Sequence, residues 1–104
     1  MTIYKLIFFV PETHKEAVKQ AVFAQGAGRY QHYDNCSWET LGTGQFRALT
    51  GSQPFIGQQD VVEQVAEYRV EMICEADYLQ PALQALVAAH PYEEPAYEFF
   101  PINE

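Results

Sequence analysis

The sequence is poor in basic residues. Six Lys and Arg stand against 14 Asp and Glu, and the formal net charge is −8. Protein affinity for a nucleic-acid backbone comes largely from Lys and Arg, and an anionic membrane surface attracts the same cationic groups. We therefore expect neither nucleic acid nor a membrane as a partner of this chain.

Long apolar runs are also absent, and there are only two cysteines. The apolar stretch at residues 6–10 is too short for a signal peptide or a membrane span, so we expect a cytoplasmic protein. Cys36 and Cys74 lie far apart in the sequence. Because the cytoplasm keeps thiols reduced, we expect two buried thiols and no disulfide.

Hydrophobic residues, in contrast, make up 48% of the 104 residues, which is ample for a packed interior. A chain of this length has room for one core, so we expect a single domain over residues 1–104. Small domains bury a smaller share of their surface than large ones, and self-association is a common remedy.

The first third of the chain has the pattern of a strand followed by a helix. Residues 3–10 are mostly apolar and either β-branched or aromatic, which predicts a buried central strand. Thr13 lies three residues before Glu16, the spacing of a capping box at a helix start. Gly26 and Gly28 permit left-handed backbone and are expected to end that helix.

The middle of the chain predicts a hairpin. Residues 30–40 and 45–50 have strand composition, and Gly42, Thr43 and Gly44 between them are typical of a tight turn. Residues 51–57 contain Gly, Ser and Pro, which predicts a loop.

The last third repeats the order of strand, helix and strand. Residues 67–74 alternate, with Glu67, Arg69 and Glu71 on one face and apolar side chains on the other, which predicts a half-buried strand. Leucines at helical spacing follow. We expect His90 to end this helix and residues 96–102 to form the last strand.

This order contains two strand–helix–strand units. Right-handed crossovers would place both helices on one face of a single antiparallel sheet. The predicted fold class is therefore α+β, a ferredoxin-like split βαβ sandwich, with the hairpin around residues 42–44 as an extra feature.

Several segments carry a family likeness: residues 26–30 (GAGRY), 33–37 (YDNCS), 42–46 (GTGQF), 54–57 (PFIG) and 90–98 (HPYEEPAYE). Together they cover nearly the whole chain, which resembles the YqfO-like proteins of the Nif-three-like family, often labelled GTP cyclohydrolase-like. The likeness is to the domain inserted in the middle of longer members, whose fold is similar to CutA and PII signalling proteins.

The resemblance implies a free-standing accessory domain that self-associates, as a trimer like its relatives or as a dimer through the hairpin. It does not imply the family's supposed hydrolase activity, because the flanking parts that hold a two-metal centre have no counterpart in this sequence.

The segment 90–95 is the strongest candidate site. His90, Tyr92, Glu93 and Glu94 lie within five residues, and an imidazole with two carboxylates can bind a divalent metal or move a proton. The alternative is structural, because Pro91 and Pro95 alone would shape the turn into the last strand.

A second candidate metal site combines His32 with Cys36. On a regular strand both share a face with Asp34, while Glu39 points away. Such mixed ligands suit Cu or Zn. The alternative is a core cysteine beside a surface histidine.

Arg29 and Arg47 are the candidate contacts for an anionic ligand. The glycine segments do not open helices, as phosphate-binding loops do. We therefore expect no nucleotide binding.

The sequence favours a non-enzymatic, self-associating domain with a binding or regulatory role, and a small molecule is its possible ligand. The competing hypothesis is a divalent-metal-binding protein or metal-dependent enzyme that uses His90, Glu93 and Glu94. A third is an enzyme with a small substrate in a cleft between subunits.

Overall fold

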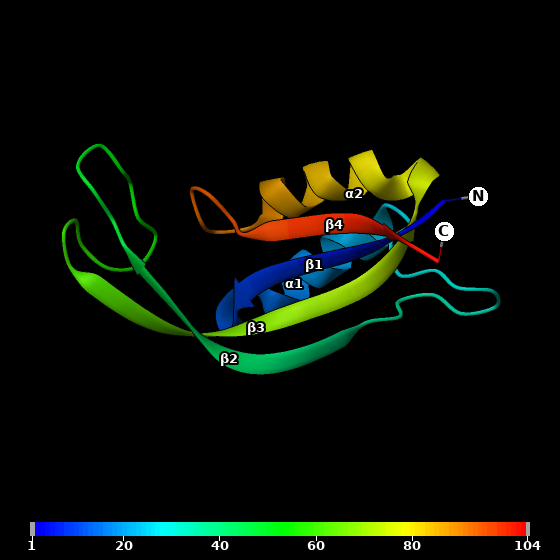
Figure 1. The fold of residues 1–104 in the computed structure, drawn as a ribbon, viewed down its shortest axis with the longest axis horizontal. Helices are drawn as coiled ribbons and strands as arrows, with labels where there is room; N and C mark the ends of the chain where they lie inside the picture. The colour runs from blue at the N-terminus through cyan, green and yellow to red at the C-terminus, as the bar shows by residue number, and fades with distance from the viewer. Residues whose placement is uncertain (1, 104) are drawn as a thin grey trace.

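The computed structural model describes residues 2–103. In chain order the elements are β1 (Ile3–Pro11), α1 (Glu12–Ala24), β2 (Trp38–Arg47), β3 (Val62–Glu75), α2 (Ala76–Ala89) and β4 (Tyr97–Ile102). The four strands form one sheet in the order β2-β3-β1-β4, and every neighbouring pair is antiparallel. Both helices lie on the same face of the sheet (Figure 1). The predicted ferredoxin-like split βαβ fold is confirmed.

The core lies between the sheet and the two helices. Every second residue of the two central strands points toward the helices, and one face of each helix points back toward the sheet. The buried side chains come from both layers: Leu6, Phe8, Val10, Val70, Met72 and Cys74 from the sheet, and Val18, Val22, Phe23, Leu79, Ala82, Leu83 and Leu86 from the helices.

The predicted hairpin turn at residues 42–44 is wrong. Residues 38–47 form one uninterrupted strand, with Gly42 opposite Glu67 and Gly44 opposite Val65 on β3. Residues 30–37 are not part of a strand, apart from an isolated bridge between Tyr30 and Tyr33. Strand β3 starts at Val62, five residues earlier than the alternation suggested. The true hairpin is β2–β3, and it is part of the four-stranded fold.

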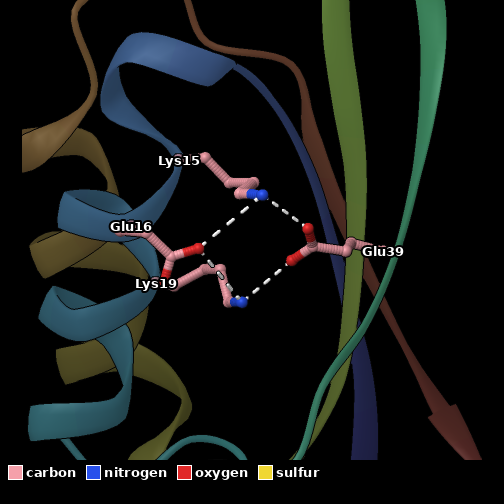
Figure 2. A network of polar contacts seen from close by, with 4 residues as sticks. All are labelled: Lys15, Glu16, Lys19 and Glu39. Carbon is pink, nitrogen blue, oxygen red and sulfur yellow. Dashed lines mark hydrogen bonds and ion pairs between the residues drawn. The ribbon is translucent and has the colours of Figure 1, made fainter.

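The predicted capping box is also wrong. Helix α1 starts at Glu12, directly after Pro11, so Thr13 already lies inside the first turn. The Glu16 carboxylate instead lies 3.7 Å from Lys15 Nζ and 3.6 Å from Lys19 Nζ. Both ammonium groups also contact Glu39 of β2, at 2.6 and 2.8 Å (Figure 2). This network ties α1 to the edge strand of the sheet.

The two glycines after α1 behave as predicted. Gly26 and Gly28 have φ angles of +108° and +81°, in a region of backbone conformation that residues other than glycine rarely adopt. A Cβ on Gly28 would lie 2.8 Å from the Phe23 ring and 3.0 Å from the Cys36 carbonyl oxygen. The backbone after α1 therefore passes close to the Phe23 ring and to Cys36, where a larger residue than glycine would not fit.

The loop at residues 48–61 and the segment at residues 90–96 lie toward the same end of the molecule, and the chain termini lie at the other (Figure 1). The loop at residues 25–37 lies near the termini. None of the described helices is long and apolar enough to span a bilayer.

Candidate functional site

A pocket of about 310 Å³ opens where the long β2–β3 loop meets the segment between α2 and β4. Four parts of the chain that are far apart in the sequence form its wall: Phe9 of β1, side chains from residues 44–56, two side chains of β3, and side chains from residues 92–96. The wall is mostly apolar, with Phe9, Phe46, Phe55 and Tyr92 as its rings. Small-molecule sites are typically apolar hollows of about 300–1,000 Å³ with a few polar groups.

The β2–β3 loop is held against the body by contacts that also shape the pocket. The backbone N–H of Gln53 donates to the Glu93 carboxylate, with N···O distances of 3.0 and 3.4 Å. The Phe55 ring packs edge-on against His14, with centroids 5.5 Å apart, and lies 6.2 Å from the Tyr92 ring. These contacts lie at the surface, since Gln53, Phe55 and Glu93 are exposed.

His90 fixes the segment that carries the pocket residues. Its Nε2 lies 2.7 Å from the carbonyl oxygen of Phe9, and its Nδ1 accepts the Tyr92 backbone N–H at 3.1 Å. This pairing places the proton on Nε2, because Nδ1 acts as an acceptor. Burial lowers the pKa of His90, and the nearby His14 lowers it further, although the hydrogen bond to Phe9 opposes them. The ring is therefore a neutral clamp between β1 and Tyr92.

Glu67 and Tyr92 form a hydrogen-bonded pair in the pocket wall. The Tyr92 hydroxyl donates to the Glu67 carboxylate, with an O···O distance of 3.4 Å. Burial raises the pKa of Glu67, and the hydrogen bond from Tyr92 only partly offsets this. Burial, with the charge of Glu67, raises the pKa of Tyr92 to about 12. Carboxylates desolvated in a cleft are frequent at binding sites.

Gly44 of β2 makes room for this pair. A Cβ on Gly44 would overlap the carboxylate of Glu67, whereas one on Gly42 would meet no atom within 4 Å. Gly44 is thus small because the Glu67 side chain lies across it. Both glycines that suggested a turn lie in strand β2, and Gly44 lines the pocket.

Three of the four candidate residues in the segment 90–95 line the pocket, namely Tyr92, Glu93 and Glu94. His90 does not, and both of its ring nitrogens are engaged in hydrogen bonds. Glu93 is engaged with the Gln53 backbone. The segment thus contributes a wall to the pocket, and its histidine holds that wall in place.

The two candidate arginines lie outside the pocket wall. Arg29 is exposed in the loop after α1, with its guanidinium 5.4 Å from the centroid of the Tyr78 ring. Arg47 is exposed at the end of β2, although its neighbours Phe46 and Ala48 both line the pocket. The structure therefore does not bring these two cations together.

The second candidate metal set was predicted to share a strand face, and that geometry is wrong because residues 32–36 form a loop. His32 is exposed, and Cys36 is partly buried with its Sγ 3.7 Å from the Asp34 carbonyl oxygen. The Glu39 carboxylate is taken up by Lys15 and Lys19. Among residues 2–103, no three His, Cys, Asp or Glu side chains converge as a metal site would require.

Both cysteines are free. Cys74 is buried as predicted, whereas Cys36 is only partly so.

Sequence reasoning missed Glu67, Phe55 and Gly44 as site residues. The alternation of β3 correctly placed Glu67 on the face away from the helices, but that face looked like solvent. The available signal was Gly44, because a glycine within a strand often marks the close approach of another group.

Comparison with curated proteins finds several GTP cyclohydrolase 1 type 2 homologs. The chain is 49% identical to the protein from Mycobacterium bovis over 96 residues, and 40% identical to that from Halalkalibacterium halodurans over 101 residues. These alignments cover 92% and 97% of this chain but only 25% and 27% of the relatives. The chain therefore spans about a quarter of the relatives' length. No family model matches the sequence.

Solved structures give the same picture. A Bacillus cereus protein related to NIF3 matches 99% of this chain with a TM-score of 0.84 and 36% identity, again over 26% of its own length. The periplasmic divalent cation tolerance protein CutA from Archaeoglobus fulgidus matches 98% of this chain and 85% of its own, with a TM-score of 0.69 and 12% identity, which shows a shared fold. The chain therefore corresponds to a CutA-like domain of the kind carried within the NIF3-related GTP cyclohydrolase 1 type 2 homologs.

Proposed function

We propose that this chain is a non-enzymatic, self-associating domain that binds a small molecule and has a regulatory role. The observation that carries the proposal is the pocket, whose wall combines a long loop with the segment from Tyr92 to Ala96. One hydrogen bond from Gln53 and the ring contacts of Phe55 hold the loop. A ligand in the pocket would touch both parts, so its binding would change how firmly the loop is held.

The binding part is tested by two-dimensional amide NMR with any molecule that copurifies and with a library of small fragments. We expect saturable shifts confined to Phe9 and residues 44–56, 65–67 and 92–96. Phe55→Ala should weaken binding, because Phe55 lines the pocket and contacts Tyr92. Leu49→Ala is the matched control, since Leu49 is exposed in the same loop and does not line the pocket. Shifts scattered over the surface, or none, would refute a binding pocket here.

Self-association is supported by the face of the sheet that carries no helices. Trp38 and Phe100 lie on this face and are 58% and 44% exposed. Exposed aromatic side chains on a sheet are frequent in subunit interfaces. We propose that a second copy covers them, in a trimer or a dimer.

Light scattering over a range of concentrations tests this, with the double variant Trp38→Ser, Phe100→Ser expected to dissociate. Tyr33→Ser is the control, because Tyr33 is also an exposed aromatic residue, at 72%, but lies in the loop after α1. A wild-type protein that is a monomer at every concentration would contradict the proposal.

The second candidate function is divalent-metal binding through His90, Glu93 and Glu94. It is favoured by the fold neighbours from Archaeoglobus fulgidus and Thermus thermophilus, which are divalent cation tolerance proteins. A metal at His90 would have to displace its bond to Phe9 or to Tyr92. Calorimetric titration with Zn²⁺ and Cu²⁺ decides it: equal heats for wild type and His90→Ala would reject this site.

The acidic composition and the two free thiols also support a cytoplasmic location, which we propose and which fractionation of cells with an antibody would test.

A further inference from the structure

The charged side chains that line the pocket are all acidic. Its wall includes Glu67, Glu93 and Glu94. Within the part of the chain that the structure describes, none of the lining residues is Lys, Arg or His. The net charge of the chain is −8, so the surrounding surface adds to the same negative potential. An anionic ligand would be repelled from this site, and a cationic one would be attracted.

Glu67 differs from Glu39 and Glu71, two half-buried carboxylates of the same sheet that form ion pairs. Glu39 on β2 is paired with Lys15 and Lys19. Glu71 on β3 is paired with Lys5 and Arg69, at 3.6 and 3.1 Å. Among residues 2–103, no Lys or Arg lies within ion-pair distance of Glu67, and the Tyr92 hydroxyl donates a hydrogen bond to its carboxylate.

A desolvated carboxylate without a counter-ion lacks a favourable interaction that a ligand can supply. A bound cation would form an ion pair with Glu67, as Lys15 does with Glu39. One carboxylate oxygen is turned to Tyr92, and the other can accept a hydrogen bond from an ammonium group.

The remainder of the pocket suits an apolar body. Phe9, Phe46, Phe55 and Tyr92 present rings, and Pro54 and Ile56 add aliphatic surface. Aromatic faces attract cations as well as apolar groups. The volume of about 310 Å³ lies at the small end of the range for ligand sites, so the body is compact.

We propose that the pocket binds a small organic amine, a compact aromatic or branched aliphatic group carrying one ammonium, with the ammonium at Glu67 and the apolar body among the four rings. This inference rests on the proposed function of the pocket as a binding site, and it specifies the chemical class of the ligand.

Three probes of the same shape test it: benzylamine, benzyl alcohol and benzoate, titrated at pH 7.5 with amide NMR as the readout. They share one ring and differ in charge, being cationic, neutral and anionic. We expect benzylamine to bind with a Kd on the order of 1 mM, as fragments of this size do. We expect benzyl alcohol to bind about tenfold more weakly and benzoate to bind most weakly, because removing the cation removes the interaction with Glu67.

Glu67→Gln removes the charge, retains the shape and leaves an amide oxygen to accept the Tyr92 hydroxyl. In this variant we expect benzylamine and benzyl alcohol to bind equally. Glu98→Gln makes the same change of charge at an exposed position of β4 that does not line the pocket, and it should keep the preference.

The outcomes separate the ligand class from the pocket itself. If benzyl alcohol or benzoate shifts the pocket resonances as strongly as benzylamine does, the amine is refuted and the binding pocket stands. Silence from all three probes would refute the amine, and the copurified-ligand and fragment experiment would then decide whether any small molecule binds. A preference for benzylamine that persists in Glu67→Gln would also refute the assignment to this carboxylate.

Discussion

The carboxylate of Glu67 occupies the space that a Cβ on Gly44 would fill. The two residues are 23 positions apart in the sequence, and the antiparallel register of β2 and β3 brings them together. This contact leaves the carboxylate beside the Tyr92 hydroxyl at the pocket wall. The shape of the candidate site thus depends on the absence of a Cβ at Gly44.

Gly44→Ala is expected to alter the site while leaving the fold nearly intact. Gly44 lies in regular strand backbone, and the group it would meet is the flexible end of Glu67. The carboxylate should therefore move away, and the free energy of unfolding should change by less than about 1 kcal/mol. The Tyr92 ring resonances should shift and the preference for benzylamine should fall.

Gly42→Ala provides the control, because a Cβ there meets open space. It should leave both the Tyr92 resonances and ligand preference unchanged. Identical behaviour of the two variants would show that Glu67 does not depend on Gly44.

His90 should make the protein less stable in mild acid. Its pKa in the folded state lies below the usual 6.5, so between these two values the unfolded chain binds more protons than the folded one. The free energy of unfolding therefore falls as pH decreases from about 7 through the folded pKa. Protonation of Nδ1 also removes the acceptor for the Tyr92 N–H.

Urea unfolding at pH 7.5, 6.5 and 5.5 measures this effect. His90→Gln should lower stability at pH 7.5 by about 1–3 kcal/mol, because buried hydrogen-bonding groups lose a partner, and should flatten the pH dependence. His32→Gln, at an exposed position, should retain the wild-type slope. Equal slopes for wild type and His90→Gln would contradict the role given to this ring.

Glu39→Gln should loosen the edge strand in a manner that depends on salt and pH. The hydrogen bonds from Lys15 and Lys19 hold the pKa of Glu39 below its usual value of 4.5. Its contribution to stability is therefore present above pH 4.5 and is lost as pH falls through the folded pKa. The loss in Glu39→Gln should appear in dilute buffer and shrink in 1 M salt, where screening acts over about 3 Å.

Thermal unfolding at the two ionic strengths measures it. Glu98→Gln serves as the control, and should show little change in either condition. A loss that is the same in dilute buffer and in 1 M salt would mean that packing, and not the charge pair, links α1 to β2.

The two thiols should react at very different rates. Burial raises the pKa of Cys74 to about 11, so at pH 8 roughly one thiol in a thousand is ionised, and the thiolate is the reactive form. Cys36 is partly exposed in a loop. With a chromogenic disulfide reagent we expect one thiol to react promptly in the native protein and the second only in denaturant.

Cys36→Ser should remove the fast phase. Two fast thiols in the wild type would contradict the burial of Cys74.

The sequence by itself determined the elements whose signals are local. The apolar residues 3–10 predicted β1, Gly26 and Gly28 predicted the end of α1, and the alternation around Glu67 predicted which face of β3 it joins. Each of these depends on side-chain periodicity or on backbone freedom within a few residues. The order of these elements was then enough to predict the split βαβ fold, because crossover handedness leaves few arrangements.

Only the tertiary structure decided the extent of β2 and the composition of the pocket. Gly42 and Gly44 have the same local signature in a tight turn and in a strand, and the difference is set by a partner strand more than 20 residues away. The pocket depends on the same register, which places Glu67 beside Gly44, and on His90, which fixes Tyr92 to β1. Such contacts between distant residues produce no repeating pattern in the sequence, because they depend on how the helices and strands pack together and not on how each one forms.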